Sequence, residues 1–566
     1  MKYRILAFFV IIATFSVYLA VGQNDKIDSF FDNRIEVYIS FKIDKQADIE
    51  TISKILSISS YDKSSGEITA YASRKELKNF IELGIEFKKL TPPSMLRKDI
   101  KMAHSKEEIM RNNWDSYPTY DAYVAMMYQF EADYPDLCKI SLIGKTNNDR
   151  DILVAKISDN VDVKEAEPEF LYTSTMHGDE TTGYVLMLRL IDYLLNNYGI
   201  DPRITDLVNG IEIYINPNAN PDGSYAAGNS NIYGATRYNS MGVDLNRNYP
   251  DPDDGPHPDG NPWQTETRAF MTFAENHNFV MSANIHGGEE VCNYPWDTWW
   301  FTTADDDWWQ YVCHEYADTA HLYSPSGFMN GFNNGITHGY TWYTITGGRQ
   351  DYMNYFHQCR EFTLEISDTK LLPANQLPAW WGYNYRSLLN YLEQVSYGVR
   401  GVVTDEDSGD FLKAEVYVMN HEADSSWVYT DIENGNYHRM IHGGTYDIKY
   451  SVHGYWPKTI QDVSVVNRQA TPLNVQLKNM LSVVENYQES PVKVYPNPVI
   501  LNYFQVSLDK KVSVIKIYNT TGKLIYTADN PNAGRYYIDV SNWNPGMYIM
   551  KVVDKNTVFT EKIQIF

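Results

Sequence analysis

The fold is decided by residues 169–180, Glu169-Phe-Leu-Tyr-Thr-Ser-Thr-Met-His177-Gly-Asp-Glu180, an apolar run of strand length that ends in polar residues. An amphipathic run of helical period follows over 181–197. His177 and Glu180 therefore lie on a turn between a strand and a helix, where an imidazole nitrogen and a carboxylate can converge on one cation. This pair of donors suits zinc. Taken alone, such a pair is more often a set of polar groups at the beginning of a helix.

The alternation of strands and helices continues on both sides of this stretch. Apolar runs of strand length lie at 152–157, 169–174, 211–215, 279–284 and 361–366. Helical runs lie at 181–197, 264–276 and 377–394. The pattern predicts an α/β fold with a mixed, largely parallel sheet flanked by helices. Because right-handed crossovers bring the loops after parallel strands to one edge of the sheet, we expect the ligand-binding residues at that edge.

Two later strands carry further polar residues. Ser282-Ala-Asn-Ile-His286 places a histidine where another buried strand reaches the same edge, and a His-Glu-His set leaves one zinc position open for water. A histidine that serves only the core is the alternative for His286. Glu361-Phe-Thr-Leu-Glu365 brings a carboxylate into an otherwise apolar strand, and we interpret Glu365 as the proton acceptor because such carboxylates are seldom there for packing.

Cationic residues that suit a carboxylate or an oxyanion lie between these motifs. They are Arg237 and the arginine of Gly242-Val-Asp-Leu-Asn246-Arg247. The planar guanidinium matches a carboxylate in a bidentate way, although either arginine alone would more often form a surface salt bridge. The loop Asp251-Pro-Asp-Asp254 has the carboxylates of a calcium site, but acidic turns of this kind usually bind nothing.

The composition excludes several classes of function. The chain has 566 residues and a formal net charge of −24, from 72 acidic and 48 basic residues. Such a field repels phosphate backbones, so nucleic acid is not an expected partner. The cysteines have no zinc-ligand spacing, so a metal must be held by histidine and carboxylate. Three pairings remain open for the four cysteines, which are Cys138, Cys292, Cys313 and Cys359.

The two ends of the chain differ from its middle. Residues 1–22 have the basic start, short apolar run and small final residues of a signal peptide, with a retained membrane helix as the alternative. No later run is long enough to span a bilayer, so we expect no stable membrane span after signal removal. Residues 30–92 predict a small α+β domain, interpreted as a detachable or folding-assisting leader rather than an independent binding module. Beyond 397, short alternating strands predict two all-β domains.

The order of the polar residues resembles the zinc carboxypeptidase family of carboxypeptidases A and B: His177, Glu180, Arg237, Asn246-Arg247, His286 and Glu365. The resemblance covers about 113–395. It implies the family's fold and one zinc ion per catalytic domain, held by His177, Glu180 and His286. Glu365 would be the general base and then the general acid, and Arg237 would stabilise the tetrahedral oxyanion. Asn246 and Arg247 would bind the terminal carboxylate of the substrate, and Tyr343 would cap the substrate.

Two segments resemble the regulatory branch of this family, which includes carboxypeptidases D, E, M and N. They are His286-Gly-Gly-Glu-Glu-Val-Cys-Asn-Tyr-Pro-Trp-Asp297 and Gly347-Gly-Arg-Gln350. Asp297 matches the acidic specificity residue of the branch and Gln350 its pocket amide, which implies a preference for C-terminal Lys or Arg. Two departures leave an apolar or aromatic preference as the alternative: Arg349, usually Met in the branch, and the aromatic stretch 299–301.

The resemblance extends to the regions around the catalytic domain, 111–396. Residues 397–480 resemble the transthyretin-like β-sandwich of the regulatory branch. Residues 490–566 resemble the C-terminal sorting domain of type IX secretion in Bacteroidetes. These likenesses imply a secreted or surface-attached enzyme, exported through the periplasm of a Gram-negative bacterium, with peptide or protein C-termini and the secretion machinery as partners. The alternatives are a catalytically weak peptide-binding protein and a zinc amidohydrolase or deacylase on the same fold.

Overall fold

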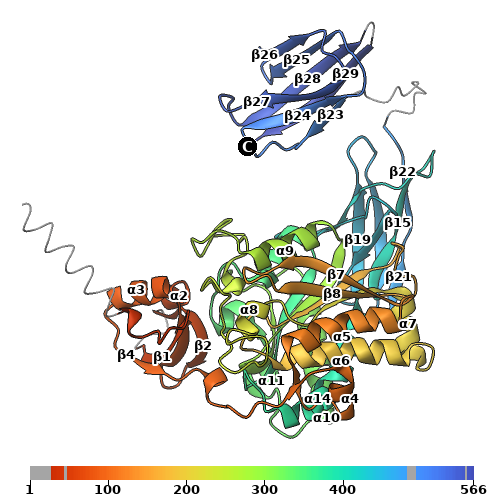
Figure 1. Cartoon of the computed structure of the whole chain (residues 1–566). Helices are drawn as coiled ribbons and strands as arrows, with labels where there is room; N and C mark the ends of the chain where they lie inside the picture. Colours follow the sequence, from red (N-terminus) through yellow and green to blue (C-terminus); the bar gives the residue numbers. More distant parts are fainter. Residues whose placement is uncertain (1–26, 44–47, 481–491, 555–556) are drawn as a thin grey trace, which may run out of the picture. The chain divides into compact units, whose positions relative to one another are not determined.

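The structure, a computed structural model, describes residues 27–43, 48–480, 492–554 and 557–566 (Figure 1). Two compact units make up the chain, 1–480 and 481–566. The predicted signal peptide lies outside the described residues. In the described part of the chain, no helix has the length and apolar character that a membrane crossing requires.

The leader, drawn in red in Figure 1, is a small α+β lobe. Its antiparallel sheet has the order β2-β3-β1-β4. The elements are β1 (Val37–Lys42), α2 (Asp48–Ser53), β2 (Ser57–Asp62), β3 (Glu67–Ala72), α3 (Arg74–Glu82) and β4 (Phe87–Leu90). Ser73 and Glu76 form a capping box that fixes the start of α3. The sequence analysis missed β2, because Ser57-Ile-Ser-Ser-Tyr-Asp62 has too few apolar residues to read as a strand.

An eight-stranded mixed sheet forms the centre of the first unit, in the order β13-β12-β14-β11-β9-β10-β8-β7. The strands are β7 (Cys138–Lys145), β8 (Asp151–Ile157), β9 (Glu169–Ser174), β10 (Glu212–Asn216), β11 (Phe279–His286), β12 (Glu289–Tyr294), β13 (Ile336–His338) and β14 (Arg360–Ser367). Pairing is parallel from β14 through β11 and β9 to β10, and β8 joins β10 antiparallel. The five predicted strands are these five neighbours, so the predicted mixed α/β sheet is confirmed.

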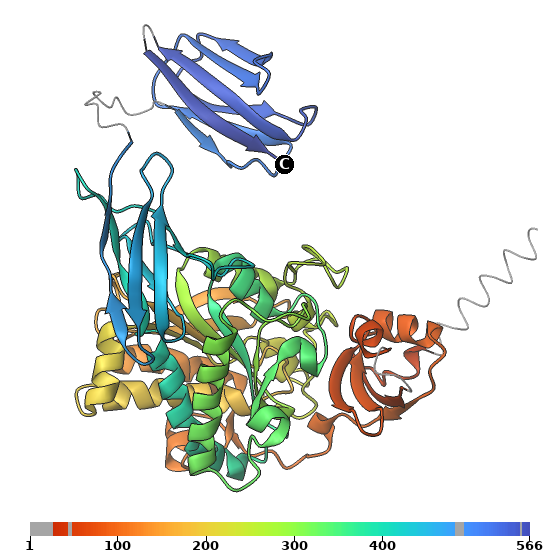
Figure 2. The same cartoon turned by 180° about the vertical axis from the view of Figure 1, so that it is seen from behind.

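Helices cover both faces of this sheet, as Figure 2 shows from behind. Leu153 and Ala155 of β8 pack in the larger core, with helices α5 (Tyr120–Asp133), α6 (Thr182–Asn197), α7 (Pro202–Gly210), α10 (Asp306–Tyr323) and α14 (Leu377–Gln394). Ile152 and Val154 alternate with them and pack on the other face, against α9 (Thr265–Glu275) and α13 (Arg349–His357). Short helices lie in the connections: α4 (Lys106–Arg111), α8 (Pro221–Ser224), α11 (Gly331–Asn334) and α12 (Gly339–Trp342).

A β-sandwich follows the α/β domain, with sheets β18-β15-β21, to which β22 adds by pairing with β15, and β17-β16-β19-β20. Its strands are β15 (Gly398–Asp405), β16 (Glu415–Val418), β17 (Val428–Tyr429), β18 (Asn436–Arg439), β19 (Gly444–Ser451), β20 (Lys458–Val465), β21 (Ala470–Pro472) and β22 (Val475–Leu477). Inward residues such as Val403, Val416 and Ile448 form a core of its own. Its likeness to a transthyretin-like module stays a prediction.

Buried charges join this sandwich to the α/β domain. Asp305, which precedes α10, accepts hydrogen bonds from Arg439 of β18 at 2.8 and 3.0 Å and from Arg360 of β14 at 2.7 Å. Glu422 pairs with the same Arg439 at 2.9 Å. Burial opposes ionisation of Asp305, but the two arginines hold the pKa of its carboxyl below the usual range. The charges therefore compensate one another across the boundary between the two domains.

The second unit is also all β, as predicted. Its two antiparallel sheets are β23-β24-β27 and β26-β25-β28-β29. The strands are β23 (Val492–Tyr495), β24 (Tyr503–Leu508), β25 (Val514–Asn519), β26 (Leu524–Asp529), β27 (Gly534–Asp539), β28 (Gly546–Asp554) and β29 (Thr557–Ile565). Phe504, Ile515 and Met550 lie between the sheets in a separate core.

Candidate metal centre and substrate cavity

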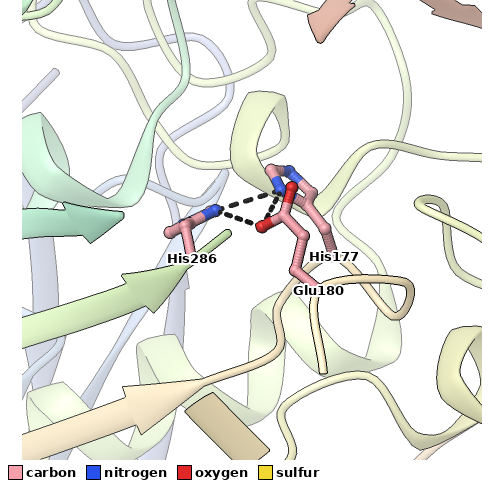
Figure 3. A group of neighbouring side chains, drawn as sticks. All are labelled: His177, Glu180 and His286. Atoms are coloured by element: carbon pink, nitrogen blue, oxygen red, sulfur yellow. Dashed lines mark hydrogen bonds and ion pairs between the residues drawn. The ribbon is translucent and has the colours of Figure 1, made fainter. Parts of the chain in front are cut away.

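Three buried side chains meet at the carboxyl edge of the central strands, where they point toward one another (Figure 3). His177 and Glu180 lie on the turn between β9 and α6, and His286 is the last residue of the neighbouring strand β11. Glu180 Oε2 lies 3.0 Å from His177 Nδ1 and 2.9 Å from His286 Nδ1. The two Nδ1 atoms are 3.0 Å apart. Parallel pairing of β9 with β11 brings the three residues together.

The orientation of His177 follows from its outer partner. His177 Nε2 lies 3.0 Å from Oδ1 of Asp244. Burial opposes ionisation of Asp244, but Arg237 holds the pKa of its carboxyl well below the usual range. An ionised carboxylate only accepts hydrogen bonds, so Nε2 is the nitrogen that donates to Asp244. Nδ1 faces the carboxylate of Glu180, and an imidazole nitrogen beside a carboxylate is a set of donors that fits zinc.

Glu180 is held by cations on its other side. Lys370 donates to Oε1 at 2.5 Å and Arg237 donates to the same oxygen at 3.3 Å. The backbone N–H of Gly287 donates to Oε2 at 3.2 Å. Burial opposes ionisation of Glu180, yet His177 and Lys370 hold the pKa of its carboxyl well below the usual range. The carboxylate is therefore charged and fixed in direction.

Glu365 stands beside this centre. It pairs in register with His286 across the parallel strands β14 and β11, so both side chains leave the sheet at the same edge. Its Oε2 atom is buried and has no hydrogen-bond partner. Burial, and next the charge of Glu180, raise the pKa of Glu365 well above its usual value. A carboxylate with a raised proton affinity is suited to accept a proton.

A small cavity opens between His177, Glu180 and His286 and the loops around them. Besides these three residues, its lining includes Arg237, Asn246, Arg247, Asp297, Tyr343 and Glu365. Arg247 uses Nη1 to bond the carbonyl of Asn246, while its Nε and Nη2 atoms are buried without partners. The structure thus gathers every predicted site residue except Gln350 around one space. Gln350 lies behind the wall, where its Oε1 accepts the backbone N–H of Thr363 at 2.7 Å.

The carboxylate of Asp297 is enclosed by small groups. Asn293 donates to its Oδ1 at 3.0 Å, and a Cβ atom on Gly339 would lie only 1.9 Å from the same oxygen. Burial raises the pKa of Asp297 to about 6, although Asn293 and Arg247 favour its charged form. The wall of the cavity therefore carries an acidic group that ionises near neutral pH.

Arg349 does not direct its charge at this cavity. Its guanidinium donates to Glu361 at 3.0 Å and to Thr173, in the buried layer over Phe270. Only its backbone N–H reaches Asn246. The charge is thus neutralised by Glu361 inside the domain. The aromatic stretch 299–301 is also absent from the lining residues, and Trp300 is 75% exposed.

The leader contacts the same centre through β2. Ser57 donates to Asp244 Oδ2 at 2.6 Å, and Tyr343 donates to the carbonyl of Ile58 at 3.4 Å. Ile58 and Ser59 line the cavity. The leader therefore closes one side of the space that Glu365 and Arg247 share.

Comparison with known proteins agrees with this geometry. The model of a family described as zinc carboxypeptidase matches residues 123–387. The catalytic chain of carboxypeptidase N from Mus musculus is 35% identical in an alignment 413 residues long, which covers 66% of this chain and 88% of that protein. The chain belongs to the zinc carboxypeptidase family. The model of the secretion system C-terminal sorting domain matches residues 493–566, so this carboxypeptidase relative carries the type IX export signal at its C-terminal end.

Other similar proteins differ more in length. Carboxypeptidase D from Anas platyrhynchos is 34% identical in an alignment 445 residues long, which covers 74% of this chain but only 31% of that protein. The crystal structure of carboxypeptidase A from Helicoverpa armigera aligns with a TM-score of 0.48 at 16% identity, covering 64% of this chain and 97% of that one.

The sequence analysis missed two residues of this zinc carboxypeptidase site. Asp244 appeared there only as part of the motif before Asn246, and Lys370 was not singled out. Each forms a hydrogen bond with a predicted metal ligand that is distant in the sequence, Asp244 with His177 and Lys370 with Glu180. The one sequence feature that pointed to Asp244 was its place two residues before the predicted substrate-binding pair. No sequence feature pointed to Lys370.

Zinc affinity tests the role of Asp244. We predict that Asp244→Asn weakens zinc binding by roughly 10- to 100-fold, because His177 loses the acceptor that fixes its tautomer and orientation. Competition with a chromophoric chelator measures the dissociation constant. Asp253→Asn, on an exposed nearby loop, is the control. Equal affinity of the Asp244→Asn variant and the wild type would contradict the assignment.

Proposed function

We propose that this protein is a secreted zinc metallocarboxypeptidase that hydrolyses the last peptide bond of peptides or proteins, with a preference for C-terminal Lys or Arg. The observation that carries the proposal is a single cavity with two unsatisfied groups. Glu365 offers an unpartnered carboxylate oxygen beside His286, and Arg247 offers two unpartnered guanidinium nitrogens. The proton acceptor suits the water that attacks the last peptide bond, and the guanidinium suits the free carboxylate of the last residue. One cavity therefore has a group for each of these two parts of a peptide C-terminus.

The metal ligands on this proposal are His177, Glu180 and His286. Zinc, when bound there, lowers the pKa of water and polarises a carbonyl group. Glu365 accepts the proton of the attacking water and then delivers it to the leaving amine, which its raised proton affinity favours. Arg237 Nη1 lies 3.3 Å from Glu180 Oε1. Its guanidinium is therefore close enough to the metal ligands of this proposal to stabilise the developing oxyanion.

Arg247 and Asn246 hold the free carboxylate of the substrate, and the Tyr343 ring covers it. The two unpartnered nitrogens of Arg247 present a fork that a carboxylate can fill. This arrangement favours a carboxypeptidase over an amidohydrolase or deacylase, whose substrates lack a terminal carboxylate. A blocked dipeptide and its C-terminal amide distinguish the two activities, and faster hydrolysis of the amide would favour the alternative.

Removal of the proton acceptor tests the mechanism. We predict that Glu365→Gln lowers kcat by about 10²- to 10⁴-fold and leaves the zinc content at one ion per chain, because Glu365 transfers protons but does not bind the metal. Turnover of a blocked dipeptide and metal analysis give the two readings. The exposed Glu275→Gln variant should keep wild-type turnover. Full activity of the Glu365→Gln variant would exclude Glu365 as the proton acceptor. Wild-type activity that persists in the presence of a chelator would exclude a role for the metal in catalysis.

The preference for a basic terminus rests on Asp297. Its carboxylate is buried at the cavity wall, and the opposing charge of Arg349 is paired with Glu361 rather than directed inward. An acidic group enclosed in this way gains from a cationic side chain and is left unpaired by an apolar one. Gln350 would contribute through Thr363 rather than by direct contact with the substrate.

Substrates that differ only in the last residue test this preference. We predict that Asp297→Asn lowers kcat/KM for C-terminal Lys by at least about 30-fold, the loss expected for a buried charge pair, and changes Leu little. Since burial raises the pKa of Asp297 to about 6, kcat/KM for Lys relative to Leu should fall as the pH drops through 6. Asp307→Asn, exposed at the start of α10, is the control. A wild-type preference for Leu or Phe would contradict the proposal.

We infer that the leader, 30–92, blocks the cavity until it is removed. Ser57 bonds to Asp244, Tyr343 bonds to Ile58, and the backbone of β2 occupies one wall of the cavity. Residues 96–99 follow the leader, and they are exposed, so the chain is open to a protease there.

Limited tryptic cleavage tests the block. Cleavage at Arg97 or Lys98 should raise turnover of a blocked dipeptide by at least about tenfold, because the freed leader can leave and the substrate can then enter. Mass analysis of the fragments is run beside the activity assay. The double variant Arg97→Gln/Lys98→Gln should stay uncut at this site and keep low activity. Equal turnover before and after cleavage would contradict the inference.

A further inference from the structure

A row of three aromatic side chains leads away from the substrate cavity. The ring of Tyr343, the residue proposed to cover the substrate, has its centroid 5.1 Å from that of Trp342. The Trp342 ring in turn lies 5.1 Å from the ring of Phe332. The ring planes are inclined by 66° and 71°, the edge-to-face arrangement that aromatic rings favour. The row therefore continues the wall of the cavity beyond Tyr343.

A crevice of about 440 Å³ lies along this row. Ser59, Glu289 and Trp342 line both the crevice and the substrate cavity, so the two spaces adjoin. Phe332 lines the crevice but not the cavity. A peptide whose last residue lies in the cavity can therefore extend the residues before it into the crevice.

The leader shows that an extended chain fits this crevice. Its strand β2, at the edge of the leader sheet, contributes residues 59–62 to the lining. The next residue, Lys63, donates to the carbonyl of Thr341 at 2.9 Å, directly before Trp342 in the sequence. The crevice therefore accepts a chain in extended conformation, and a substrate peptide can take that place after the leader has left.

Phe332 is held in its position at a cost to the backbone. Its φ of 51° and ψ of −135° belong to a region that favours glycine. Met329 and Asn334, on the same loop, also have positive φ angles. The Phe332 side chain is 44% exposed, so burial in a core does not offset the strain. A strained residue that presents an exposed aromatic ring beside a substrate cavity indicates a ligand that packs against the ring.

We propose that the crevice binds the two residues that precede the last residue of a substrate, and that Phe332 and Trp342 select aromatic or large apolar side chains there. The proposal rests on the proposed function, because the cavity has to hold the last residue before the crevice can receive those in front of it. Two residues of an extended chain span roughly 7 Å. This length is comparable with the two successive ring spacings of 5.1 Å between Tyr343 and Phe332.

Contact with the two rings supplies this preference. A large side chain that packs against Phe332 and Trp342 removes apolar surface from water. An aromatic side chain adds the favourable contact between rings. Glycine at the same positions of the substrate gains neither. The protein therefore selects its substrates by their last three residues and not by the last residue alone.

Peptide affinity tests the proposal without any need for turnover. The Glu365→Gln variant is loaded with zinc, cut at Arg97 or Lys98 with both fragments retained, and titrated with blocked peptides that end in Phe-Phe-Lys or Gly-Gly-Lys. Since both peptides compete with the leader alike, the ratio of their dissociation constants reports the crevice. The Phe-Phe-Lys peptide should bind at least about tenfold more tightly. Equal dissociation constants would overturn this proposal alone, whereas binding of neither peptide would overturn the proposed function as well.

Two further variants in the same background locate the preference. Phe332→Gly should reduce the advantage of the Phe-Phe-Lys peptide to about threefold or less and leave the affinity for Gly-Gly-Lys unchanged. Because glycine adopts this backbone conformation without strain, the variant should keep or raise the thermal midpoint of its parent. Phe356→Ala is the matched control, since its ring is 42% exposed but does not line the crevice, and it should keep the full advantage. An undiminished advantage in the Phe332→Gly chain would overturn the role of Phe332.

Discussion

The site depends on the parallel pairing of three adjacent strands, β9, β11 and β14. Parallel strands in register deliver their last residues to one edge. Residues that are far apart in the sequence, His177, His286 and Glu365, thereby become neighbours without any direct link between their loops. A shift of β11 by one residue would turn His286 to the opposite face of the sheet, so the register of the strand pairing also sets how His177, Glu180 and His286 meet.

Charge compensation is the second constraint at this edge. Glu180, Asp244 and Glu365 are acidic groups in a buried setting, and Arg237 and Lys370 are the cations nearest to them. A buried charge is tolerated only when it is paired and hydrogen-bonded. Glu365 is the member whose Oε2 atom lacks a hydrogen-bond partner. Burial, followed by the charge of Glu180, raises the pKa of its carboxyl well above the usual value.

The sequence predicted the centre of the molecule better than its edges. The five strands β8, β9, β10, β11 and β14 were predicted because burial on both faces makes them continuous apolar runs. Strands β7 and β12 lie outside them and are more polar, so periodicity alone did not separate them from loops. At the site, motif residues were predicted, whereas Asp244 and Lys370 act through contacts across the fold. The direction of Arg349 depended on Glu361, which no local pattern reveals.

The charges around Asp305 decide whether the α/β domain and the β-sandwich can be separated or exchanged independently. Arg360 begins the strand that carries Glu365, and Arg439 comes from the β-sandwich, yet the carboxylate of Asp305 accepts hydrogen bonds from both. A truncation after the α/β domain would leave Asp305 and Arg360 open to water at the boundary, and a sandwich grafted from a relative would need a matching arginine. The α/β domain and the β-sandwich therefore have to be engineered as one piece.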